Sequence, residues 1–316
     1  MTTTTRTDLA LAVDIGGTKV DAALVSTDGA LRADSRNRAA TGSDASRDEL
    51  LASIDTAVTT ALASLTPDDT FVGTGIGSAG PISLTAGAIS PINLPQLRGF
   101  GVRDFIEERV RDRVGDAPVT LRLDGTCIAL AEHWLGATRG VDNSMAMVVS
   151  TGVGGGIIVG GRVLAGDSGN AGHIGQLQIA TRTPGETSEP VSLEHLAAGP
   201  HIVAWAQSQG WKGTRGEELA ADYADGVPVA VEAVHRSTTA VGEAITSAAT
   251  LLDLRHVAIG GGFVNVASDY IDLVLETIHE CAIVDYARGV AVTRSALSDE
   301  GPLIGAAALI HRSDLL

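Results

Sequence analysis

Hydrophobic and polar residues alternate in blocks up to residue 123, and the blocks predict an α/β unit. Apolar runs at 9–13 and 20–25 flank the segment Asp14-Ile-Gly-Gly-Thr-Lys19. Two apolar runs around a glycine turn favour a β-hairpin over strand, loop and helix, so this turn is not expected to be a Walker loop. Apolar residues at helical spacing after Ser46 predict a capped helix that ends before Pro67. The other elements predicted in this unit are strands at 71–76 and 119–123, a loop at 77–81 and a charged amphipathic helix at 105–114.

The rest of the chain repeats this order of elements. A helix is predicted from Gly125, followed by strands at 145–150 and 157–159 around a second glycine turn, Thr151-Gly-Val-Gly-Gly-Gly156. The recurrence of hairpin, glycine turn and helix predicts two pseudo-symmetric halves, with a period too long for a solenoid. The remaining predicted elements are a surface loop at 181–190, helices at 193–208, 216–224, 228–251 and 303–310, and a strand at 257–259 that ends in Gly260-Gly-Gly262.

The composition restricts the class of protein. With 316 residues, 44% of them hydrophobic, the chain is long enough for roughly two domains and too apolar for disorder. Its formal charge of -16 opposes binding to nucleic acid and to anionic membranes, so neither is expected as a partner. The two cysteines exclude a disulfide framework and residues 1–8 lack the features of a signal peptide, so a cytoplasmic location is predicted. The 38 glycines exceed the usual share of about 7% and indicate loops where the backbone approaches a ligand.

Three glycine turns follow three of the predicted strands, and this arrangement indicates phosphate binding. Glycine lets backbone amides approach an anion, Thr18 and Lys19 add donors, and Asp14 offers a carboxylate to a hydrated Mg²⁺. A site made of amides, one lysine and a metal can bind a nucleotide in spite of the acidic net charge. The predicted nucleotide-binding residues are Asp14, Gly16, Gly17, Thr18, Lys19, Thr151, Gly152, Gly154, Gly155, Gly260, Gly261 and Gly262.

The segments LAVDIGGTKVDAALV, STGVGGGIIVGGRVLAG and VAIGGG resemble the two phosphate motifs and the adenosine motif of the actin-like ATPase superfamily. In detail the chain resembles the ROK sugar kinases (repressors, open reading frames, kinases) over nearly its whole length. The resemblance implies an α/β fold in which two ribonuclease-H-like domains surround a central cleft, with ATP and Mg²⁺ as cofactors, a sugar as substrate and a homodimer as the assembly. It also implies a small domain of residues 8–122 plus 303–316 and a large domain of residues 123–302.

The resemblance further assigns roles at the substrate site. Asp124 stands at the family's catalytic aspartate, where a carboxylate suits a general base for a sugar hydroxyl; a helix-capping role is the alternative. Glu194 corresponds to the family glutamate that binds sugar hydroxyls; the alternative is a helix-start residue favoured by the helix dipole. The predicted substrate-binding residues are Gly80, Asn93, Asp124, His173 and Glu194.

Several positions depart from the family's pattern. The family's Gly-Glu-x-Gly-His segment, which supplies a sugar-binding glutamate and a zinc-contacting histidine, reads Gly172-His-Ile-Gly-Gln176 here. Residues 181–192 contain no cysteine where the family has its zinc-binding cluster, so a member without structural zinc is predicted. Leu123 and Thr126 replace the two asparagines of the family's Asn-Asp-x-Asn motif, which indicates an altered sugar pocket. His173 is interpreted either as a substrate contact or as a core histidine.

Two functions are consistent with these residues. The leading hypothesis is an ATP-dependent kinase that phosphorylates a hydroxyl of a hexose or N-acetylhexosamine of the glucose, N-acetylglucosamine or N-acetylmannosamine type. The alternative is a catalytically weak or inactive sensor that binds sugar or nucleotide through an altered pocket. A repressor of the same family would need a helix-turn-helix domain before the first phosphate motif, which begins at Asp14, and the acidic charge opposes DNA binding.

Overall fold

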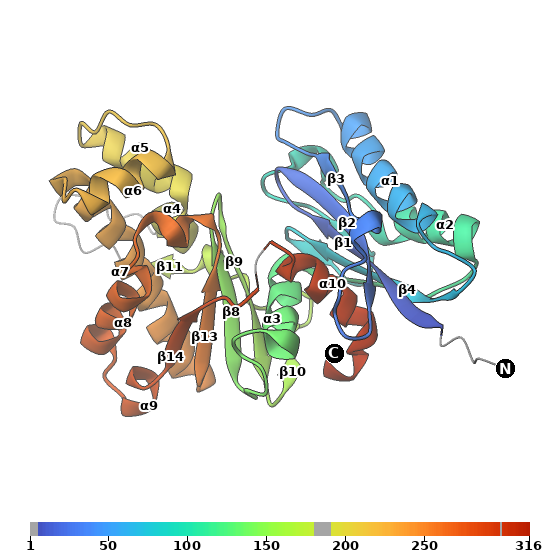
Figure 1. Ribbon diagram of the computed structural model, residues 1–316. Coiled ribbons are helices and arrows are strands. Elements are labelled where there is room, and N and C mark those ends of the chain that lie inside the picture. The colour runs from blue at the N-terminus through green and yellow to red at the C-terminus, as the bar shows by residue number, and fades with distance from the viewer. Residues whose placement is uncertain (1–5, 180–190, 298) are drawn as a thin grey trace.

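The computed structural model describes residues 6–179, 191–297 and 299–316, and it has two lobes that each contain a five-stranded sheet (Figure 1). The strands of the N-terminal sheet are β1 (Thr7–Ile15), β2 (Lys19–Ser26), β3 (Asn37–Ala40), β4 (Asp69–Ser78) and β7 (Val119–Leu123). Their order is β3-β2-β1-β4-β7, in which β1 and β2 form the predicted antiparallel hairpin and β4 and β7 continue the sheet in parallel.

The C-terminal sheet repeats this topology. Its strands are β8 (Ser144–Val149), β9 (Val153–Val159), β10 (Arg162–Val163), β13 (His256–Gly260) and β14 (Ala291–Arg294), in the order β10-β9-β8-β13-β14. The hairpin of β8 and β9 corresponds to that of β1 and β2, and β13 and β14 continue in parallel. The predicted pseudo-symmetry is therefore confirmed. Two short hairpins lie outside the sheets: β5 (Ile82–Ser83) with β6 (Ala88–Ile89), and β11 (Gln178–Ile179) with β12 (Val191–Ser192).

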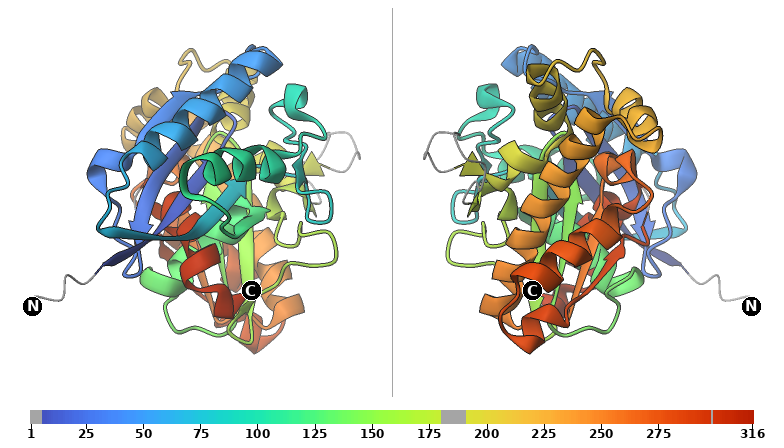
Figure 2. Two further views of the ribbon diagram at one scale, coloured as in Figure 1. Left: turned by 90° about the vertical axis from the view of Figure 1, so that its right-hand side faces the viewer. Right: turned by 90° about the vertical axis from the view of Figure 1, so that its left-hand side faces the viewer.

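Helices α1 (Arg47–Ala63) and α2 (Val102–Val114) cover the outer face of the N-terminal sheet (Figure 2). Helix α1 begins at the predicted N-cap, because the Ser46 hydroxyl accepts the Glu49 N–H and the Glu49 carboxylate accepts the Ser46 N–H. Its apolar side, which includes Leu50, Ile54 and Val58, is buried against the sheet. The sequence therefore determines both the start of this helix and the face that it buries.

On the outer side of the C-terminal sheet, six helices of the described residues form the larger core together with the sheet. They are α4 (Leu193–Ala197), α5 (Gly199–Ser208), α6 (Gly216–Ala224), α7 (Pro228–Leu252), α8 (Tyr270–Cys281) and α9 (Asp285–Arg288). Residues 193–208 were expected to form one helix, but the structure has α4 and α5 with a break at Ala198. Ala198 has extended backbone angles, and Pro200 then starts α5, where its missing N–H costs nothing. No helix in the described ranges is long and apolar enough to cross a membrane.

Helices α3 (Asp124–Leu135) and α10 (Gly301–His311) lie between the two sheets (Figure 1). They share a core of small residues with the inner faces of both sheets, to which Ala12 of β1 and Ala258 of β13 belong. Glycines allow backbone to approach backbone here: a Cβ on Gly75 would lie 1.7 Å from the Ala306 carbonyl oxygen, and one on Gly305 would lie 1.8 Å from that of Cys127. The two lobes are therefore joined through closely packed helices.

The second glycine hairpin differs from its prediction. Its second strand was expected to begin at residue 157, but β9 begins at Val153, so Gly154, Gly155 and Gly156 are strand residues. The physical reason is the first turn of α3, which packs directly on this strand: a Cβ on Gly156 would lie 2.2 Å from the Gly125 carbonyl oxygen. Part of the glycine run thus serves close packing of a helix on a sheet. The predicted loop at 181–190 lies outside the described residues.

Candidate active site

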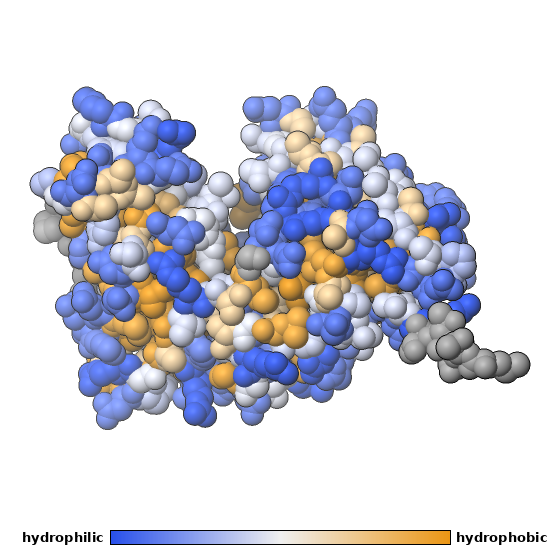
Figure 3. Space-filling model, in the orientation of Figure 1, coloured by the Kyte–Doolittle hydropathy of each residue, from blue (hydrophilic) through white to orange (hydrophobic). Residues whose placement is uncertain are grey.

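Residues of all three glycine turns line two neighbouring cavities, and the first turn reaches them through Lys19. The space-filling view shows a notch between the lobes (Figure 3). One cavity of about 570 Å³ is lined by Lys19 and by Gly260, Gly261 and Gly262, among others. A second cavity of about 810 Å³ is lined by Thr151, Gly199 and Phe263, among others. Ser150, Gly262 and Asn265 line both cavities, so the two are parts of a continuous groove.

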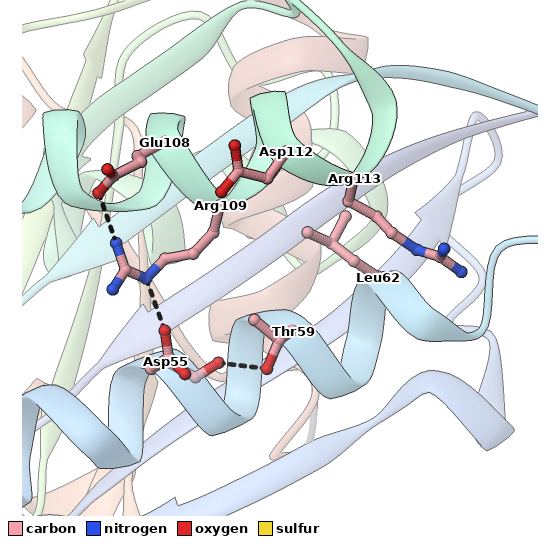
Figure 4. Close-up of a pocket in the computed structure, with 7 residues that line it drawn as sticks. All are labelled: Asp55, Thr59, Leu62, Glu108, Arg109, Asp112 and Arg113. Atoms are coloured by element: carbon pink, nitrogen blue, oxygen red, sulfur yellow. Dashed lines mark hydrogen bonds and ion pairs between the residues drawn. The ribbon is translucent and has the colours of Figure 1, made fainter.

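A further pocket lies between α1 and α2 and is lined mainly by charged residues (Figure 4). Two of its carboxylates pair with one guanidinium: Arg109 contacts Asp55 at 2.7 Å and Glu108 at 3.1 Å. The pocket lies on the outer side of the N-terminal sheet, away from the glycine turns (Figure 1). None of the predicted site residues lines it.

The first glycine turn is held rigidly at the end of β1. The Gly16 N–H donates to the Lys19 carbonyl at 2.9 Å, and the Thr41 hydroxyl donates to the Gly16 carbonyl at 2.9 Å. Gly17 is needed for a close approach, because a Cβ there would lie 2.0 Å from the Asn93 amide nitrogen. The predicted nucleotide-side residue Gly17 and the predicted substrate-side residue Asn93 are therefore in contact.

Asp124 interacts with two other predicted carboxylates, Asp14 and Glu194. Burial raises the pKa of Asp14 to about 7, with the Asp124 carboxylate acting in the same direction and Lys19 opposing it. Burial also raises the pKa of Asp124 to about 6; the Gly125 N–H, which donates to Asp124 at 2.7 Å, opposes this, and the Glu194 carboxylate adds to it. The structure thus places Asp124 within electrostatic reach of Asp14 and, separately, of Glu194.

Glu194 also supports the second glycine turn. Its carboxylate accepts the N–H of Val153 at 2.9 Å, and a Cβ on Gly152 would lie 2.6 Å from its Oε2 atom. Gly152 is therefore required for this contact. A Cβ on Gly154 would meet no atom within 4 Å, so Gly154 borders open space, whereas Gly155 is buried against Ile174.

The predicted substrate residues Gly80 and His173 face each other beside Leu123. A Cβ on Gly80 would lie 2.4 Å from the Leu123 Cδ1 atom and 3.6 Å from the His173 Cε1 atom. Burial lowers the pKa of His173 and so favours the neutral ring, whereas the Glu194 carboxylate opposes this. The ring is half-buried, and it forms no hydrogen bond with another side chain or backbone group within the described residues.

The carboxylates of Asp14 and Asp124 form a set of oxygen ligands that suits Mg²⁺. Asp14 is a buried carboxylate beside a second one, Asp124, and Lys19 and Arg38 are the cations that act on it. In the described ranges no group of three or more His, Cys, Asp or Glu side chains could form a metal cage. Mg²⁺ keeps most of its waters and needs only one or two protein carboxylates besides substrate phosphates, so this arrangement suits it.

One buried acid at the groove is missed by sequence reasoning. Glu132 of α3 lines the first cavity, and its carboxylate accepts the Ala137 N–H at 2.6 Å and the Ser295 hydroxyl. It is 1% exposed. An acidic residue in the otherwise apolar segment Ala129-Leu-Ala-Glu132 was a signal that could have found it.

Comparison with known proteins identifies the family. The model of the ROK family matches residues 10–313. The chain belongs to the ROK family. It is 33% identical over 270 residues to the N-acetylmannosamine kinase of Yersinia pseudotuberculosis, which covers 84% of this chain and 86% of the relative.

Solved structures of this family have the same fold. The ROK hexokinase of Thermus thermophilus is 29% identical, with a TM-score of 0.77 over 97% of this chain and 99% of that one. The ROK glucokinase of Streptomyces griseus, solved with glucose and AMPPNP, is 24% identical, with a TM-score of 0.77 over 96% of this chain and 99% of that one. The predicted actin-like two-domain fold is confirmed, and the protein is an ATP-dependent sugar kinase.

Proposed function

We propose that the protein transfers the γ-phosphoryl group of ATP to a hydroxyl of a hexose or an N-acetylhexosamine, with Asp124 as the general base. The observation that carries this proposal is the position of Asp124, in the first turn of α3, within electrostatic reach of Asp14 on the nucleotide side and of Glu194 on the other. A carboxylate at this place can accept the hydroxyl proton as the sugar oxygen attacks the phosphorus. A pKa near 6 leaves Asp124 ionised, and thus a competent base, at neutral pH.

For the nucleotide, we assign ATP to the groove that the two cavities form together. Thr151 and Gly262 border the groove between them, and Lys19 lies at the N-terminal lobe's side. The amides of the first glycine turn, with Thr18 and Lys19, would steady the phosphate oxygens. Asp14 would hold Mg²⁺ through water, and the ion would neutralise charge on the β- and γ-phosphates.

For the sugar, we assign Gly80, Asn93, His173 and Glu194 to one pocket beside Asp124. Glu194 uses one oxygen for the Val153 N–H, which leaves acceptor capacity for sugar hydroxyls. The unpartnered His173 ring offers one donor and one acceptor in its neutral form. The 33% identity to an N-acetylmannosamine kinase makes N-acetylmannosamine the first sugar to test.

We also propose the domain division 8–122 plus 303–316 and 123–302, a homodimer, a cytoplasmic location, and the absence of structural zinc and of a nucleic-acid partner. The packing of α10 on β1 and β4 supports the assignment of the C-terminal segment to the small domain. The zinc prediction concerns mainly residues outside the described ranges. Light scattering of the purified protein and metal analysis by plasma mass spectrometry test the assembly and the zinc content.

A coupled ADP-release assay tests the proposed function. The protein is supplied with ATP, Mg²⁺ and, in turn, N-acetylmannosamine, N-acetylglucosamine and glucose. We expect turnover with at least one sugar and a loss of about 10²- to 10⁴-fold in Asp124→Asn. The matched control is Asp116→Asn, since Asp116 is a surface carboxylate that pairs with Arg111. Equal turnover in Asp124→Asn contradicts the role of the base; sugar binding in a calorimeter without any turnover favours the sensor.

A further inference from the structure

A loop of the C-terminal lobe, residues 164–173, is fastened to the N-terminal lobe by one side chain. The Asn170 amide forms two hydrogen bonds with the backbone of Ile82 in β5: its Oδ1 accepts the Ile82 N–H at 2.8 Å, and its Nδ2 donates to the Ile82 carbonyl at 2.8 Å. Together these bonds satisfy both backbone groups of Ile82, a residue that is 5% exposed. The loop and the β5 hairpin lie side by side in the side view (Figure 2).

An apolar contact accompanies the two hydrogen bonds. Gly169 lies directly against Leu84, and a Cβ on Gly169 would be 2.6 Å from the Leu84 Cγ atom. Gly169 also has a φ of +89°, a conformation that favours glycine. Ser168 adds a further contact, because its hydroxyl accepts from the Asn170 Nδ2 at 3.1 Å. Gly169 and Asn170 therefore form the docking contact, and Ser168 holds the Asn170 amide from within the loop.

The docked segment carries a residue of the sugar pocket. The His173 N–H points to the Asn170 carbonyl at 3.4 Å, so the two residues belong to one turn. The His173 ring lies beside Gly80, which comes two residues before Ile82. The Asn170 Oδ1 atom itself is 3.6 Å from the position of a Cβ on Gly80. A shift of the loop away from Ile82 would thus move His173 away from Gly80 and Leu123.

We propose that Asn170 is a positioning residue for the sugar site, which ties the loop of the C-terminal lobe to the N-terminal lobe and so holds His173 against Gly80 and Leu123. This proposal rests on the proposed function in assigning these residues to the sugar pocket. Asn170 lines neither cavity of the nucleotide groove. Removal of the Asn170 side chain should therefore weaken the binding of the sugar and leave the binding of the nucleotide unchanged. General destabilisation of the protein would affect both.

The first test uses Asn170→Ala and Asn170→Asp in the full chain. Asn170→Ala removes both hydrogen bonds. Asn170→Asp keeps an acceptor for the Ile82 N–H but places a carboxylate oxygen against the Ile82 carbonyl. Two net hydrogen bonds correspond to a change of roughly 10- to 100-fold. We expect the sugar KM, and the sugar Kd in a calorimeter, to rise by this factor in both variants, with the ATP KM within about twofold of the wild type.

The matched control is Asn143→Ala. Asn143 also contacts two backbone groups with its amide, the Gly160 N–H at 2.8 Å and the Asp253 carbonyl at 3.5 Å, but it lies at the far ends of the strands, outside the groove. This control is expected to leave both KM values unchanged. An unchanged sugar KM in Asn170→Ala, or equal rises of the sugar and ATP KM values, would overturn the proposal.

Hydrogen exchange provides a readout that does not depend on catalysis. The Ile82 amide donates only to Asn170 among the described residues, so its peptide should exchange at least tenfold faster in Asn170→Ala than in the wild type or in Asn143→Ala. Unchanged exchange of residues 80–84 would overturn the docking contact. Absence of turnover with every sugar, together with faster exchange in Asn170→Ala, would instead reject the proposed function and leave the docking contact established.

Discussion

Gly125, the second residue of α3, offers a sharp test of how the fold positions Asp124. A Cβ on Gly125 would lie 2.0 Å from the carbonyl oxygen and 2.8 Å from the amide nitrogen of Gly155 in β9. Both are backbone atoms of a central strand pair, which no rotamer change can move aside. The substitution Gly125→Ala therefore requires the first turn of α3 to withdraw from the sheet.

The size of this withdrawal follows from the contact distances. Ordinary contacts of a Cβ atom begin near 3.4 Å, so the helix has to retreat by roughly 1 Å or more. Overpacking of this kind costs about 1–3 kcal/mol of stability. A shift of about 1 Å in a catalytic group costs on the order of 100-fold in rate. Helix propensity alone predicts the opposite sign for stability, a gain of up to about 1 kcal/mol for Ala over Gly.

The assay compares kcat from ADP release and the free energy of unfolding from urea denaturation for Gly125→Ala and the wild type. We expect kcat to fall about 100-fold and stability to fall by about 1–3 kcal/mol. The control is Gly42→Ala, because a Cβ on Gly42 would meet no atom within 4 Å and its φ is not in the left-handed region. A variant Gly125→Ala that is more stable than the wild type and keeps its kcat would refute the reasoning.

Three further predictions concern single side chains. Burial raises the pKa of Asp124 to about 6, and only the ionised carboxylate accepts a proton, so kcat should fall tenfold per pH unit below pH 6. A pH–rate profile from about pH 5 to 8 measures this fall, and a flat profile contradicts it. Glu194→Gln keeps an acceptor for the Val153 N–H but loses the charge, so steady-state kinetics and thermal melting should show a sugar KM raised on the order of tenfold at an unchanged Tm. Hydrogen bonds from Arg32 hold the pKa of Asp69 well below its usual range, so Asp69→Asn should lower the free energy of unfolding by about 1 kcal/mol at neutral pH, as measured by urea denaturation. This loss should shrink as the pH falls below about 4, because Asp69 then becomes protonated in the unfolded wild type. A loss that does not change with pH would argue against the ion pair.

Local patterns were sufficient for most elements and for the repeat. The capping box at Ser46 and the two glycine hairpins are determined by neighbours in the sequence, and the structure confirms them. The early start of β9 was not predicted because it depends on the packing of α3, whereas the break at Ala198 has a local signal, Pro200, that was not used. In the sequence, Gly155 and Gly156 indicate a phosphate loop. In the structure they also pack closely against Gly125, a residue distant in the chain, so glycine is needed there for packing as well. A glycine run by itself does not show whether it is approached by a ligand or by another part of the backbone.

The candidate site was predicted in outline for a different reason. Asp124 and Glu194 are separated by 70 positions with no periodicity that links them, so their assignment to one site came from the family resemblance. In the structure the Glu194 carboxylate acts on the pKa of Asp124. Asn170 escaped notice because its partner is the backbone of Ile82, 88 residues earlier, and a backbone group leaves no mark in the sequence. A hydrogen bond between a side chain and a distant backbone group therefore cannot be predicted from the sequence.

The burial of α10 has a consequence for the order in which the chain folds during synthesis. The strands of the N-terminal sheet are complete at residue 123, yet one face of β1 and β4 is covered by α10, which begins at residue 301. During synthesis on the ribosome, the small apolar residues of this face therefore stay exposed to solvent until the C-terminal lobe has been translated. Because partly folded chains with uncovered apolar faces aggregate, we expect the N-terminal lobe to be prone to aggregation until α10 has been synthesised and has packed on it.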